Sequence, residues 1–384
     1  MTTILPGSTI GFLGGGQLAR MSALAARSMG YEVHVLDPDP DCPAAAVASH
    51  LVTARYDDVT AATAFARTCD VITLDIEQVA TESIAAASVH APVHPGAAAI
   101  HIIQDRGRQK DWLQQHGFPV VPFRIAHAPH EVEQAWDALG RSIAKTTSGG
   151  YDGRGQARIR SVHDVPAASA LTQSATVVVE QWLELAGELS VMVARSSAGE
   201  VRTFPVSWNH HDHGVLTWAM TPAPVSDATA AAAIALASSI AAALGIVGLL
   251  AVELFVTMED ALMVNELAPR PHNTFHATER ACLTSQFEQQ VRAVCGLPLG
   301  STALLSAGAI VNLLGDLWPA SGEHPAWERA LEVHGVRLHL YGKKLAKPGR
   351  KMGHLSAVGP TPEAARDAVM DAFSRLLPQL ATLV

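Results

Sequence analysis

The residues with the clearest chemical potential are a lysine and the glycine-rich stretch that follows it. Lys145 precedes Thr-Thr-Ser-Gly-Gly-Tyr-Asp-Gly-Arg-Gly-Gln, which places four glycines within residues 149–155. Glycines permit backbone conformations that other residues avoid, so successive amide N–H groups can surround an anion. A lysine ammonium group adds a positive charge of the kind that holds a nucleotide phosphate. The stretch matches neither G-x-x-x-x-G-K-[ST] nor G-x-G-x-x-G, and taken alone it fits a flexible glycine hairpin equally well.

Two carboxylates further along the chain end predicted core strands. Glu253 lies in Ala-Val-Glu-Leu-Phe, and Glu266 lies in Val-Asn-Glu-Leu-Ala-Pro-Arg. A carboxylate is costly to bury without a partner, so acids in such apolar segments imply a cation or a donor nearby. Mg²⁺ is commonly held by one or two carboxylates together with substrate phosphates. The pair therefore predicts a magnesium–nucleotide site, and a hydrogen-bonded structural role is the alternative for each acid.

Two cationic segments follow this pair. Arg270, His272 and Asn273 stand in one short loop, and an arginine matches carboxylate or phosphate oxygens in a bidentate geometry, so the loop suits a small planar oxyanion. His276 is a candidate for a supporting hydrogen bond. Residues 341–351 then gather lysines and an arginine around a Pro-Gly turn. A solvated basic loop is the default interpretation of such a charge run, and a phosphate clamp fits it as well in an acidic protein.

Composition limits the class of protein. The 384 residues carry a net charge of −9, with 16% charged and 48% hydrophobic residues, which predicts a folded protein of two or three domains. No basic run is long enough to favour a nucleic-acid partner. The four cysteines are far apart, which suits a reduced cytoplasm better than disulfides or a zinc site. No signal peptide is evident at the N-terminus. We therefore expect a soluble, cytoplasmic protein that acts on small molecules.

One uncharged segment, residues 228–252, is long enough to cross a bilayer. Its first half is rich in alanine, and Gly245 and Gly248 separate that half from a β-like apolar run. A buried helix followed by a core strand is therefore the better interpretation, and no membrane contact is expected.

The elements that must position these residues begin with a βαβ unit. Residues 9–13 read as a strand, the glycines at 14–16 as its turn, residues 19–29 as a helix and residues 31–36 as the next strand. This pattern opens a doubly wound parallel sheet, in which Asp37 stands where dinucleotide folds place a ribose-binding acid. Ala19 replaces the last glycine of that fingerprint, so NAD binding is only weakly indicated.

The rest of the chain alternates between α/β and α+β patterns. Residues 69–77 read as a strand that carries Asp75 and Glu77 near its end, and residues 97–116 are mainly helical. We predict an N-terminal α/β domain over residues 1–103, a small lid over 104–181 and a larger mixed domain over 182–384. The expected strands of the last two are residues 120–123, 142–145, 176–180, 189–194, 201–206, 249–257 and 261–266. Thr361 is expected to cap a terminal helix.

Together these segments resemble a known family. The set Gly-Gly-Gly-Gln-Leu-Ala-Arg-Met, Gly-Gly-Tyr-Asp-Gly-Arg-Gly-Gln, Asn-Glu-Leu-Ala-Pro-Arg-Pro-His-Asn, Thr-Ser-Gln-Phe-Glu-Gln and Pro-Gly-Arg-Lys-Met-Gly-His occurs in order between about residues 9 and 359. It resembles 5-(carboxyamino)imidazole ribonucleotide synthase, a purine-pathway member of the ATP-grasp superfamily. The resemblance implies an ATP-grasp fold, a dimer, and a ligase that uses ATP, Mg²⁺ and bicarbonate. In this family ATP phosphorylates bicarbonate to carboxyphosphate, and the amine of 5-aminoimidazole ribonucleotide takes the carboxyl group.

The resemblance also implies a role for individual residues. For ATP these are Arg106, Lys145, Gly150, Gly153, Arg154, Gly155, Gln156, Glu180, Gln181, Trp182, Leu183, Glu188, His211 and Asn265. For Mg²⁺ they are Glu253 and Glu266. For the carboxyl transfer they are Arg270, His272, Asn273, Tyr151 and Asp152. For the ribonucleotide they are Gln17, Leu18, Asp75, Lys343 and Arg350.

The departures from the family pattern gather around the acceptor. The family usually has Glu at the positions of Asp75 and Trp208, and Gly at the positions of Phe275 and Ala19. It usually has Ser at the position of Thr274. Two alternatives follow from these differences. One is a related ligase that carboxylates another, phosphorylated amine in specialised metabolism. The other is a nucleotide-binding protein without turnover, although the intact acid pair argues against it.

Overall fold

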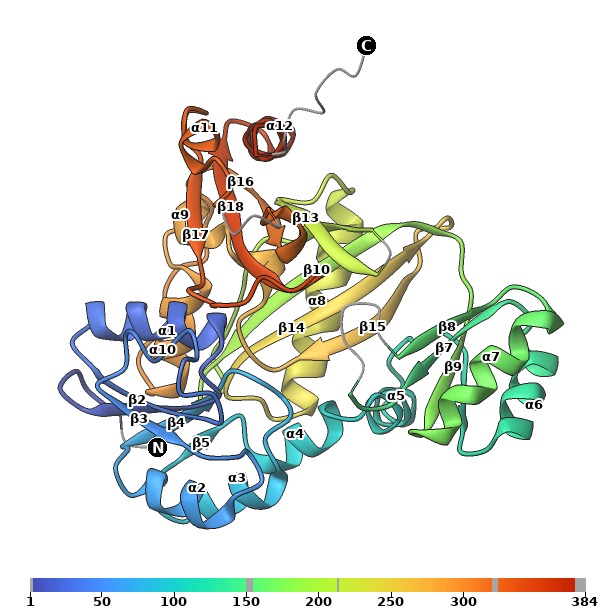
Figure 1. Ribbon diagram of the computed structural model, residues 1–384, viewed down its shortest axis with the longest axis horizontal. Helices are drawn as coiled ribbons and strands as arrows, with labels where there is room; N and C mark the ends of the chain where they lie inside the picture. Colours follow the sequence, from blue (N-terminus) through green and yellow to red (C-terminus); the bar gives the residue numbers. More distant parts are fainter. Residues whose placement is uncertain (1–2, 150–154, 213, 320–323, 377–384) are drawn as a thin grey trace.

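The computed structural model describes residues 3–149, 155–212, 214–319 and 324–376. Three sheets are formed by these described residues. Figure 1 shows the resulting arrangement: an N-terminal unit, a smaller unit that holds β6 to β9, and a long central sheet that connects both to the C-terminal region. This agrees with the mixed α/β and α+β architecture predicted from the sequence.

The N-terminal unit is a doubly wound parallel sheet with strand order β3-β2-β1-β4-β5. Apolar side chains pack on both faces: one cluster joins the sheet to α1 and α10, and the other joins it to α2 and α3. Sheets buried on both faces read as continuous apolar strands, which is why this unit was visible in the sequence. Its elements are β1 (Thr9–Leu13), α1 (Gln17–Ser28), β2 (Glu32–Asp37), β3 (His50–Thr53), α2 (Val59–Ala66), β4 (Val71–Leu74), α3 (Thr81–Ala87) and β5 (Val93–His94).

Two boundaries in this unit differ from prediction. The strand expected over residues 69–77 ends at Leu74, because the Asp75 carboxylate turns back to accept N–H groups of α1. The helix expected over residues 97–116 is two helices, α4 (Ala97–Ile103) and α5 (Arg106–Gln115). Asp105 separates them, since its side chain caps α5 by accepting the N–H of Arg108.

The smaller unit is an antiparallel sheet, in the order β6-β9-β7-β8, with α6 and α7 on one face. The glycine-rich stretch connects β7 to β8, as expected. The strand predicted over residues 120–123 is displaced: β6 starts at Phe123, and Val120 instead pairs with Val264 of the central sheet. The elements are β6 (Phe123–Ala126), α6 (Pro129–Leu139), β7 (Ser142–Thr146), β8 (Gln156–Ile159), η1 (Val162–Asp164), α7 (Val165–Ser169), η2 (Ala170–Gln173) and β9 (Val177–Gln181).

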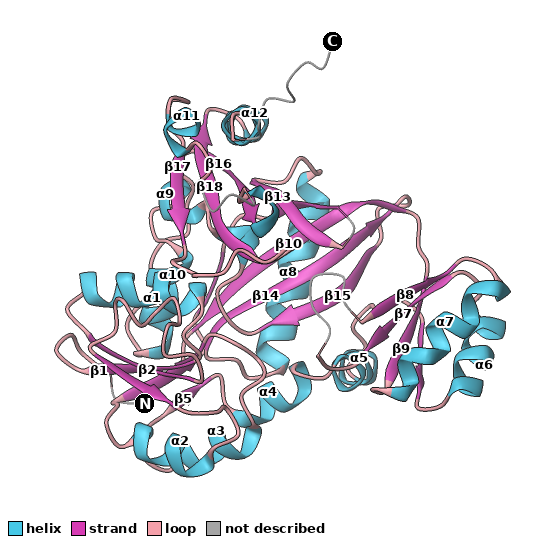
Figure 2. Cartoon of the chain, viewed as in Figure 1, coloured by secondary structure: helices cyan, strands magenta, loops and turns pink. Residues whose placement is uncertain are grey.

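The central sheet is antiparallel, in the order β15-β14-β10-β12-β13-β16-β18-β17, with β11 paired to β10 (Figure 2). Its strands are β10 (Leu185–Arg195), β11 (Val201–Thr203), β12 (Ser207–Asp212), β13 (Val215–Thr221), β14 (Gly248–Thr257), β15 (Leu262–Ala268), β16 (Ala307–Leu314), β17 (Arg337–Leu340) and β18 (Lys351–Gly359). Its helices are α8 (Asp227–Ala243), η3 (Asn273–Phe275), α9 (Thr278–Ala281), α10 (Gln286–Val294), η4 (Gly315–Leu317), α11 (Trp327–Leu331) and α12 (Pro362–Ser374).

Two sequence predictions are confirmed in this region. The uncharged segment forms the helix α8 and then the core strand β14, and its apolar side chains belong to the largest buried cluster. In the described part of the chain, no helix has the length and apolarity needed to cross a membrane. Thr361 caps α12 by accepting the N–H of Ala364.

Candidate active site

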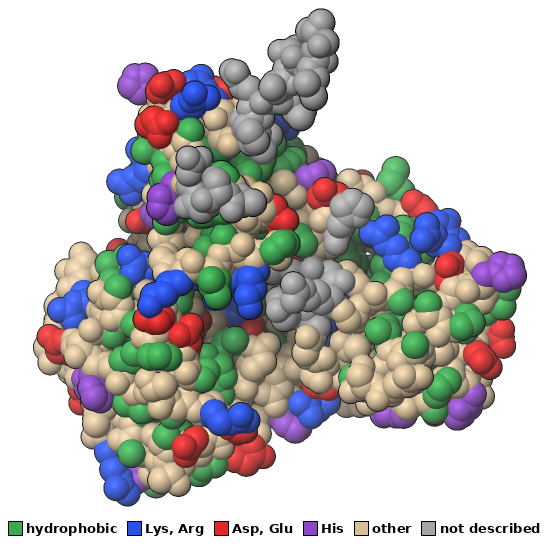
Figure 3. All heavy atoms as spheres, viewed as in Figure 1, with side chains coloured by type: hydrophobic (Ala, Val, Ile, Leu, Met, Phe, Trp, Pro, Cys, Tyr) green, Lys and Arg blue, Asp and Glu red, His purple; other side chains and the backbone are tan. Residues whose placement is uncertain are grey.

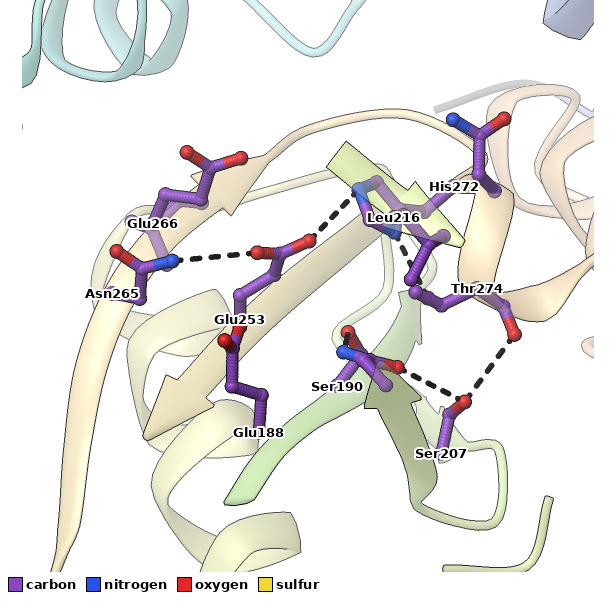
Figure 4. Close-up of polar contacts among 12 residues, drawn as sticks. Glu188, Ser190, Ser207, Leu216, Glu253, Asn265, Glu266, His272 and Thr274 are labelled. Carbon is purple, nitrogen blue, oxygen red and sulfur yellow. Dashed lines mark hydrogen bonds and ion pairs between the residues drawn. The ribbon is translucent and has the colours of Figure 1, made fainter. Parts of the chain in front are cut away.

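The predicted metal residues lie side by side on two neighbouring strands. Glu253 of β14 pairs directly with Glu266 of β15, and the register shifts immediately afterwards, so Asn265 is an extra residue on β15. A bulge of this kind re-aims side chains that would otherwise point to opposite faces. Asn265 donates to Glu253 at 3.4 Å, and Figure 4 shows Asn265, Glu253 and Glu266 together. The bulge, which no sequence pattern indicated, brings all three side chains to one site.

The electrostatics of this group favour a cation. Burial and the nearby charge of Glu266 raise the pKa of Glu253 to about 8. The side-chain oxygen of Asn265 is buried without a hydrogen-bond partner among the described residues. Two carboxylates and an unused amide oxygen are hard oxygen donors of the type that Mg²⁺ takes. The described residues contain no group of three or more His, Cys, Asp and Glu residues arranged for a metal. The donors present therefore fit an ion whose remaining ligands come from substrate phosphates or water.

The predicted nucleotide residues gather around one buried acid. The carboxylate of Glu180 on β9 accepts a hydrogen bond from the Lys145 ammonium group at 2.9 Å, and it lies 3.3 Å from the Arg106 guanidinium. Arg106 also reaches Glu266 at 2.7 Å, which joins this cluster to the metal residues. Burial alone would raise the pKa of Glu180, but the surrounding cations, Lys145 first, bring it well below its usual range. The acid therefore stays charged and holds the cationic groups of Lys145 and Arg106 in place.

Lys110 is a member of this cluster that the sequence analysis missed. Its ammonium group is fully buried, 3.5 Å from a Glu180 oxygen. Burial lowers the pKa of Lys110 to about 8. A signal was available, because Lys110 lies three residues before the buried Leu113 on α5 and so shares its inward face. A lysine on the buried face of a helix requires a partner, and here that partner is Glu180.

The predicted adenine and ribose residues continue from Glu180 along the chain. The backbone N–H of Trp182 donates to the backbone carbonyl of Arg141, and the centroid of the Trp182 ring lies 5.5 Å from the Arg141 guanidinium. Glu188 of β10 and His211 of β12 approach to 2.9 Å. Burial would lower the pKa of His211, but Glu188 and the metal-site acids raise it above its usual value. Gln181 is the last residue of β9, and Leu183 follows Trp182 in the segment before β10.

The predicted oxyanion residues lie between the N-terminal unit and the central sheet. The guanidinium of Arg270 forms an ion pair with Glu77 at 2.7 Å across the two units. His272 points toward the acid pair, with Nε2 3.2 Å from Glu253 (Figure 4). Burial holds the pKa of His272 well below its usual value, so the imidazole is neutral. In Figure 3, charged side chains of both signs gather where the N-terminal unit meets the rest of the molecule. Asn273 begins the buried turn η3.

The predicted acceptor residues fall into two groups. The Asp75 carboxylate accepts the N–H groups of Gly16 at 2.8 Å and Ala19 at 2.5 Å. Burial raises the pKa of Asp75, and these two amides and Arg270 oppose that effect. Gln17 opens α1, and the side chain of Leu18 is buried, so only the backbone of Leu18 could contact a ligand.

The second acceptor group lies on the loop before β18. Lys343 donates to the carbonyl of Lys351 at 2.8 Å, and Arg350 donates to that of Leu345 at 3.0 Å. Lys344 pairs with Asp41 of the N-terminal unit at 2.6 Å. These contacts shape the loop and tie it to the N-terminal unit, but they do not join Lys343 or Arg350 to Arg270.

Part of the predicted site falls on residues that the structure does not describe: Gly150, Tyr151, Asp152, Gly153 and Arg154. The described end of the glycine stretch has Gly155 in a left-handed conformation, with its carbonyl accepting the N–H of Thr146. Gln156 then pairs with Lys145, so the stretch leaves and re-enters the sheet beside the lysine.

The departures from the family pattern have structural explanations. Phe275 is fully buried and packs against Phe204, and Thr274 is buried beside it. The Trp208 ring covers Gly187, where an added Cβ would lie 2.0 Å from the indole. Phe275 and Trp208 therefore belong to packing clusters, whereas Asp75 bonds Gly16 and Ala19, which flank the predicted ribonucleotide residues Gln17 and Leu18. The buried carboxylate of Asp37 accepts the N–H of Gly15 and the hydroxyl of Tyr56, so it is used within the N-terminal unit.

An α/β unit, a small antiparallel sheet and a central sheet that carries an acid pair beside Arg106 and Lys145 define the ATP-grasp class of ligases. Comparison with known families agrees: the ATP-grasp domain matches residues 111–287, the ribonucleotide synthetase preATP-grasp domain residues 7–104, and the phosphoribosylaminoimidazole carboxylase C-terminal domain residues 308–368. The chain belongs to the N5-carboxyaminoimidazole ribonucleotide synthase family. The enzyme of that name from Bacillus subtilis (strain 168) is 42% identical over 354 residues, which cover 92% of each chain. The Brucella melitensis enzyme is also 42% identical, over 94% of this chain and 98% of its own.

Solved structures lead to the same family. A crystal structure of the ADP complex of N5-carboxyaminoimidazole ribonucleotide synthetase has a TM-score of 0.92 at 40% identity, and covers 97% of this chain and 98% of its own. The Aspergillus clavatus synthase, in complex with ADP and 5-aminoimidazole ribonucleotide, has a TM-score of 0.89 at 32% identity, over 96% of this chain and 98% of its own. Both the fold and the family expected from the sequence motifs are confirmed.

Proposed function

We propose that this protein carboxylates the exocyclic amine of 5-aminoimidazole ribonucleotide. ATP transfers its γ-phosphoryl group to bicarbonate, giving ADP and carboxyphosphate. The amine then takes the carboxyl group, phosphate leaves, and 5-(carboxyamino)imidazole ribonucleotide results. The observation that carries the proposal is the paired Glu253 and Glu266, joined through Arg106 to the Glu180 cluster. The ADP and ribonucleotide complex of the Aspergillus clavatus relative supports the choice of substrates.

In the first step the chain must bind ATP and balance its charge. Lys145 and Arg106 would turn from Glu180 and Glu266 toward the phosphates, and Lys110 would remain to keep Glu180 neutralised. Glu253 and Glu266, with the amide oxygen of Asn265, would hold Mg²⁺. When bound, this ion neutralises charge on the transferring phosphoryl oxygens. The small unit that holds β6 to β9 would act as a lid and exclude water from an acyl phosphate that hydrolyses readily.

In the second step the chain must hold a small planar anion close to the amine. Arg270 offers its guanidinium, and Glu77 fixes its direction from the other unit. His272 lies against Glu253, with Nε2 3.2 Å from the carboxyl group, and its neutral imidazole can donate a hydrogen bond. Placing both groups on well-packed elements provides a preorganised site, which is the usual source of stabilisation in such transfers.

For the acceptor, the N-terminus of α1 supplies a suitable surface. Asp75 and Asp37 use the N–H groups of Gly16, Ala19 and Gly15, so the amides of Gln17 and Leu18 are the first-turn groups left for a ligand. Lys343 and Arg350 would hold the ribonucleotide phosphate from the opposite loop.

The test is ADP release by purified protein with Mg-ATP and bicarbonate, with and without 5-aminoimidazole ribonucleotide. Strong stimulation by the ribonucleotide, together with a labile carboxylated product, is the expected result. Bicarbonate-dependent release that the ribonucleotide does not increase would point to another amine acceptor, for which Asp75 is the motivating difference. Folded protein that released no ADP under either condition would favour the nucleotide-binding alternative.

The family resemblance also supports a homodimer and a cytoplasmic location. Light scattering on the purified protein tests the dimer, which a monomer mass at micromolar concentration would exclude. The four cysteines are unpaired and three of them are buried, which suits a reducing compartment.

A further inference from the structure

A short chain of buried hydrogen bonds lies beneath the oxyanion loop. Gln286, the first residue of α10, accepts the backbone N–H of His272 at 2.8 Å and donates to the backbone carbonyl of the same residue at 2.9 Å. A backbone N–H can only donate and a carbonyl can only accept, so these two bonds determine which end of the Gln286 amide is oxygen and which is nitrogen.

The remaining proton of that amide nitrogen faces a histidine. The Gln286 amide nitrogen lies 3.1 Å from Nδ1 of His276. This ring nitrogen must therefore accept the hydrogen bond and must carry no proton. In a neutral imidazole the proton is then on Nε2, which lies 3.0 Å from the side-chain oxygen of Asn273. The direction of each bond therefore follows from the one before it.

The surroundings keep the imidazole of His276 neutral. Its ring is almost fully buried and stacks on His354, with centroids 4.5 Å apart, and on Phe287 at 5.7 Å. Burial lowers the pKa of His276 to about 3, and the nearby His339 and Lys351 act in the same direction. Two protons on this ring would also place a donor against the Gln286 amide nitrogen, which has no lone pair to accept it.

We propose that Gln286 and His276 are positioning residues that lock the Asn273 side chain with its oxygen inward and its NH₂ group toward the oxyanion site. Asn273 follows Arg270 and His272 in the same loop, so the loop presents a guanidinium, an imidazole and an amide donor to one small anion. This inference rests on the proposed function, because it assigns the amide to the oxygens of bicarbonate or carboxyphosphate. A carboxylate or a reversed amide at this position would repel those oxygens.

The first test measures the tautomer and needs no activity. Histidine-selective nitrogen-15 NMR on the whole protein, with the His276→Gln variant used to assign the signal, reports which ring nitrogen is protonated. We expect a neutral ring protonated at Nε2, unchanged between pH 6 and pH 8. A proton on Nδ1, or an imidazolium in that range, would overturn the proposed order of hydrogen bonds.

The second test is kinetic. His276→Leu removes the donor, whereas the amide nitrogen of His276→Gln can reach the place of Nε2. Since the loss of one preorganised donor costs about 10²- to 10³-fold in kcat, we expect His276→Leu to lower kcat about 10- to 100-fold with little change in the KM for ATP. His276→Gln should recover most of that loss. His339→Gln, at the partly exposed end of the histidine stack, is the matched control and should behave as wild type.

The outcomes separate this proposal from the reaction itself. The positioning role would be overturned if the two His276 variants lost kcat equally at an unchanged melting temperature. It would also be overturned if neither variant lost kcat. Wild-type protein that released no ADP would remove the proposed function, and the tautomer measurement would then decide the hydrogen-bond order alone.

Discussion

The buried lysine of α5 allows a stability prediction whose sign is unusual. Lys110 is fully buried, its ammonium group lacks a hydrogen-bond acceptor among the described residues, and its closest acid oxygen, on Glu180, is 3.5 Å away. Its pKa falls from 10.5 to about 8 on folding, mainly because of burial. A difference of about 2.5 pH units corresponds to about 3 kcal/mol by which the charged lysine destabilises the folded state. We therefore expect Lys110→Met, which keeps the length of the side chain, to stabilise the protein by up to about 3 kcal/mol at pH 7.

The pH dependence provides the sharper part of this prediction. Because the folded pKa lies below the unfolded one, the cost is fully present below about pH 8 and is lost as the pH rises toward 10.5. The gain from Lys110→Met should shrink over the same interval. Urea unfolding of the wild type and the variant at pH 7 and pH 10, followed by tryptophan fluorescence, measures both values. Lys344→Met, at an exposed lysine, is the control and should change little.

Two results would refute this reasoning. The first is a variant less stable than wild type at pH 7, which would mean that the attraction of Lys110 to Glu180 outweighs its burial. The second is a gain that does not vary with pH. The substitution also removes one cation from the nucleotide cluster, so we expect weaker ATP binding by calorimetry despite the greater stability.

Three other substitutions test separate parts of the site. Glu266→Gln removes a proposed metal ligand and should lower the rate of phosphoryl transfer by about a thousandfold or more, since a bound metal supplies several kcal/mol; wild-type ADP release would exclude the metal assignment. Arg350→Ala should raise the KM for the phosphorylated acceptor about 10- to 100-fold, because a charge-assisted hydrogen bond is worth about 1.5–3 kcal/mol, and an unchanged KM would exclude the clamp. Gly187→Ala places a Cβ 2.0 Å from the Trp208 ring and should destabilise the protein by about 1–3 kcal/mol in urea unfolding; wild-type stability would show that the indole moves freely.

Asp75 shows how far sequence reasoning could go at the acceptor site. The sequence placed it near the end of a predicted strand, and in the structure it directly follows β4 at the carboxyl edge of the parallel sheet. The sequence could not show that its carboxylate turns to the amides of Gly16 and Ala19, because those groups approach it only when α1 packs beside β4. The same limit explains Asp37, whose carboxylate is used by Gly15 and Tyr56 inside the unit.

Features that are local along the chain could be predicted from the amino-acid sequence alone. These include the glycine turn before α1, the lysine before the glycine stretch, the acids within the apolar strands β14 and β15, and the cap of α12 at Thr361. Each depends on residue types at short spacing, where backbone conformation and side-chain chemistry are set by neighbours. The order of these motifs was also sufficient to indicate the family.

Only the tertiary structure decided how distant segments meet. The bulge at Asn265 depends on how β15 pairs with β14, and the ion pair of Arg270 with Glu77 depends on how the two units pack. The burial of Lys110 against Glu180, and the hydrogen bonds from Gln286 to His276, join residues brought together by the same packing. Register and packing are collective properties of the folded chain, so no single stretch of sequence contains them.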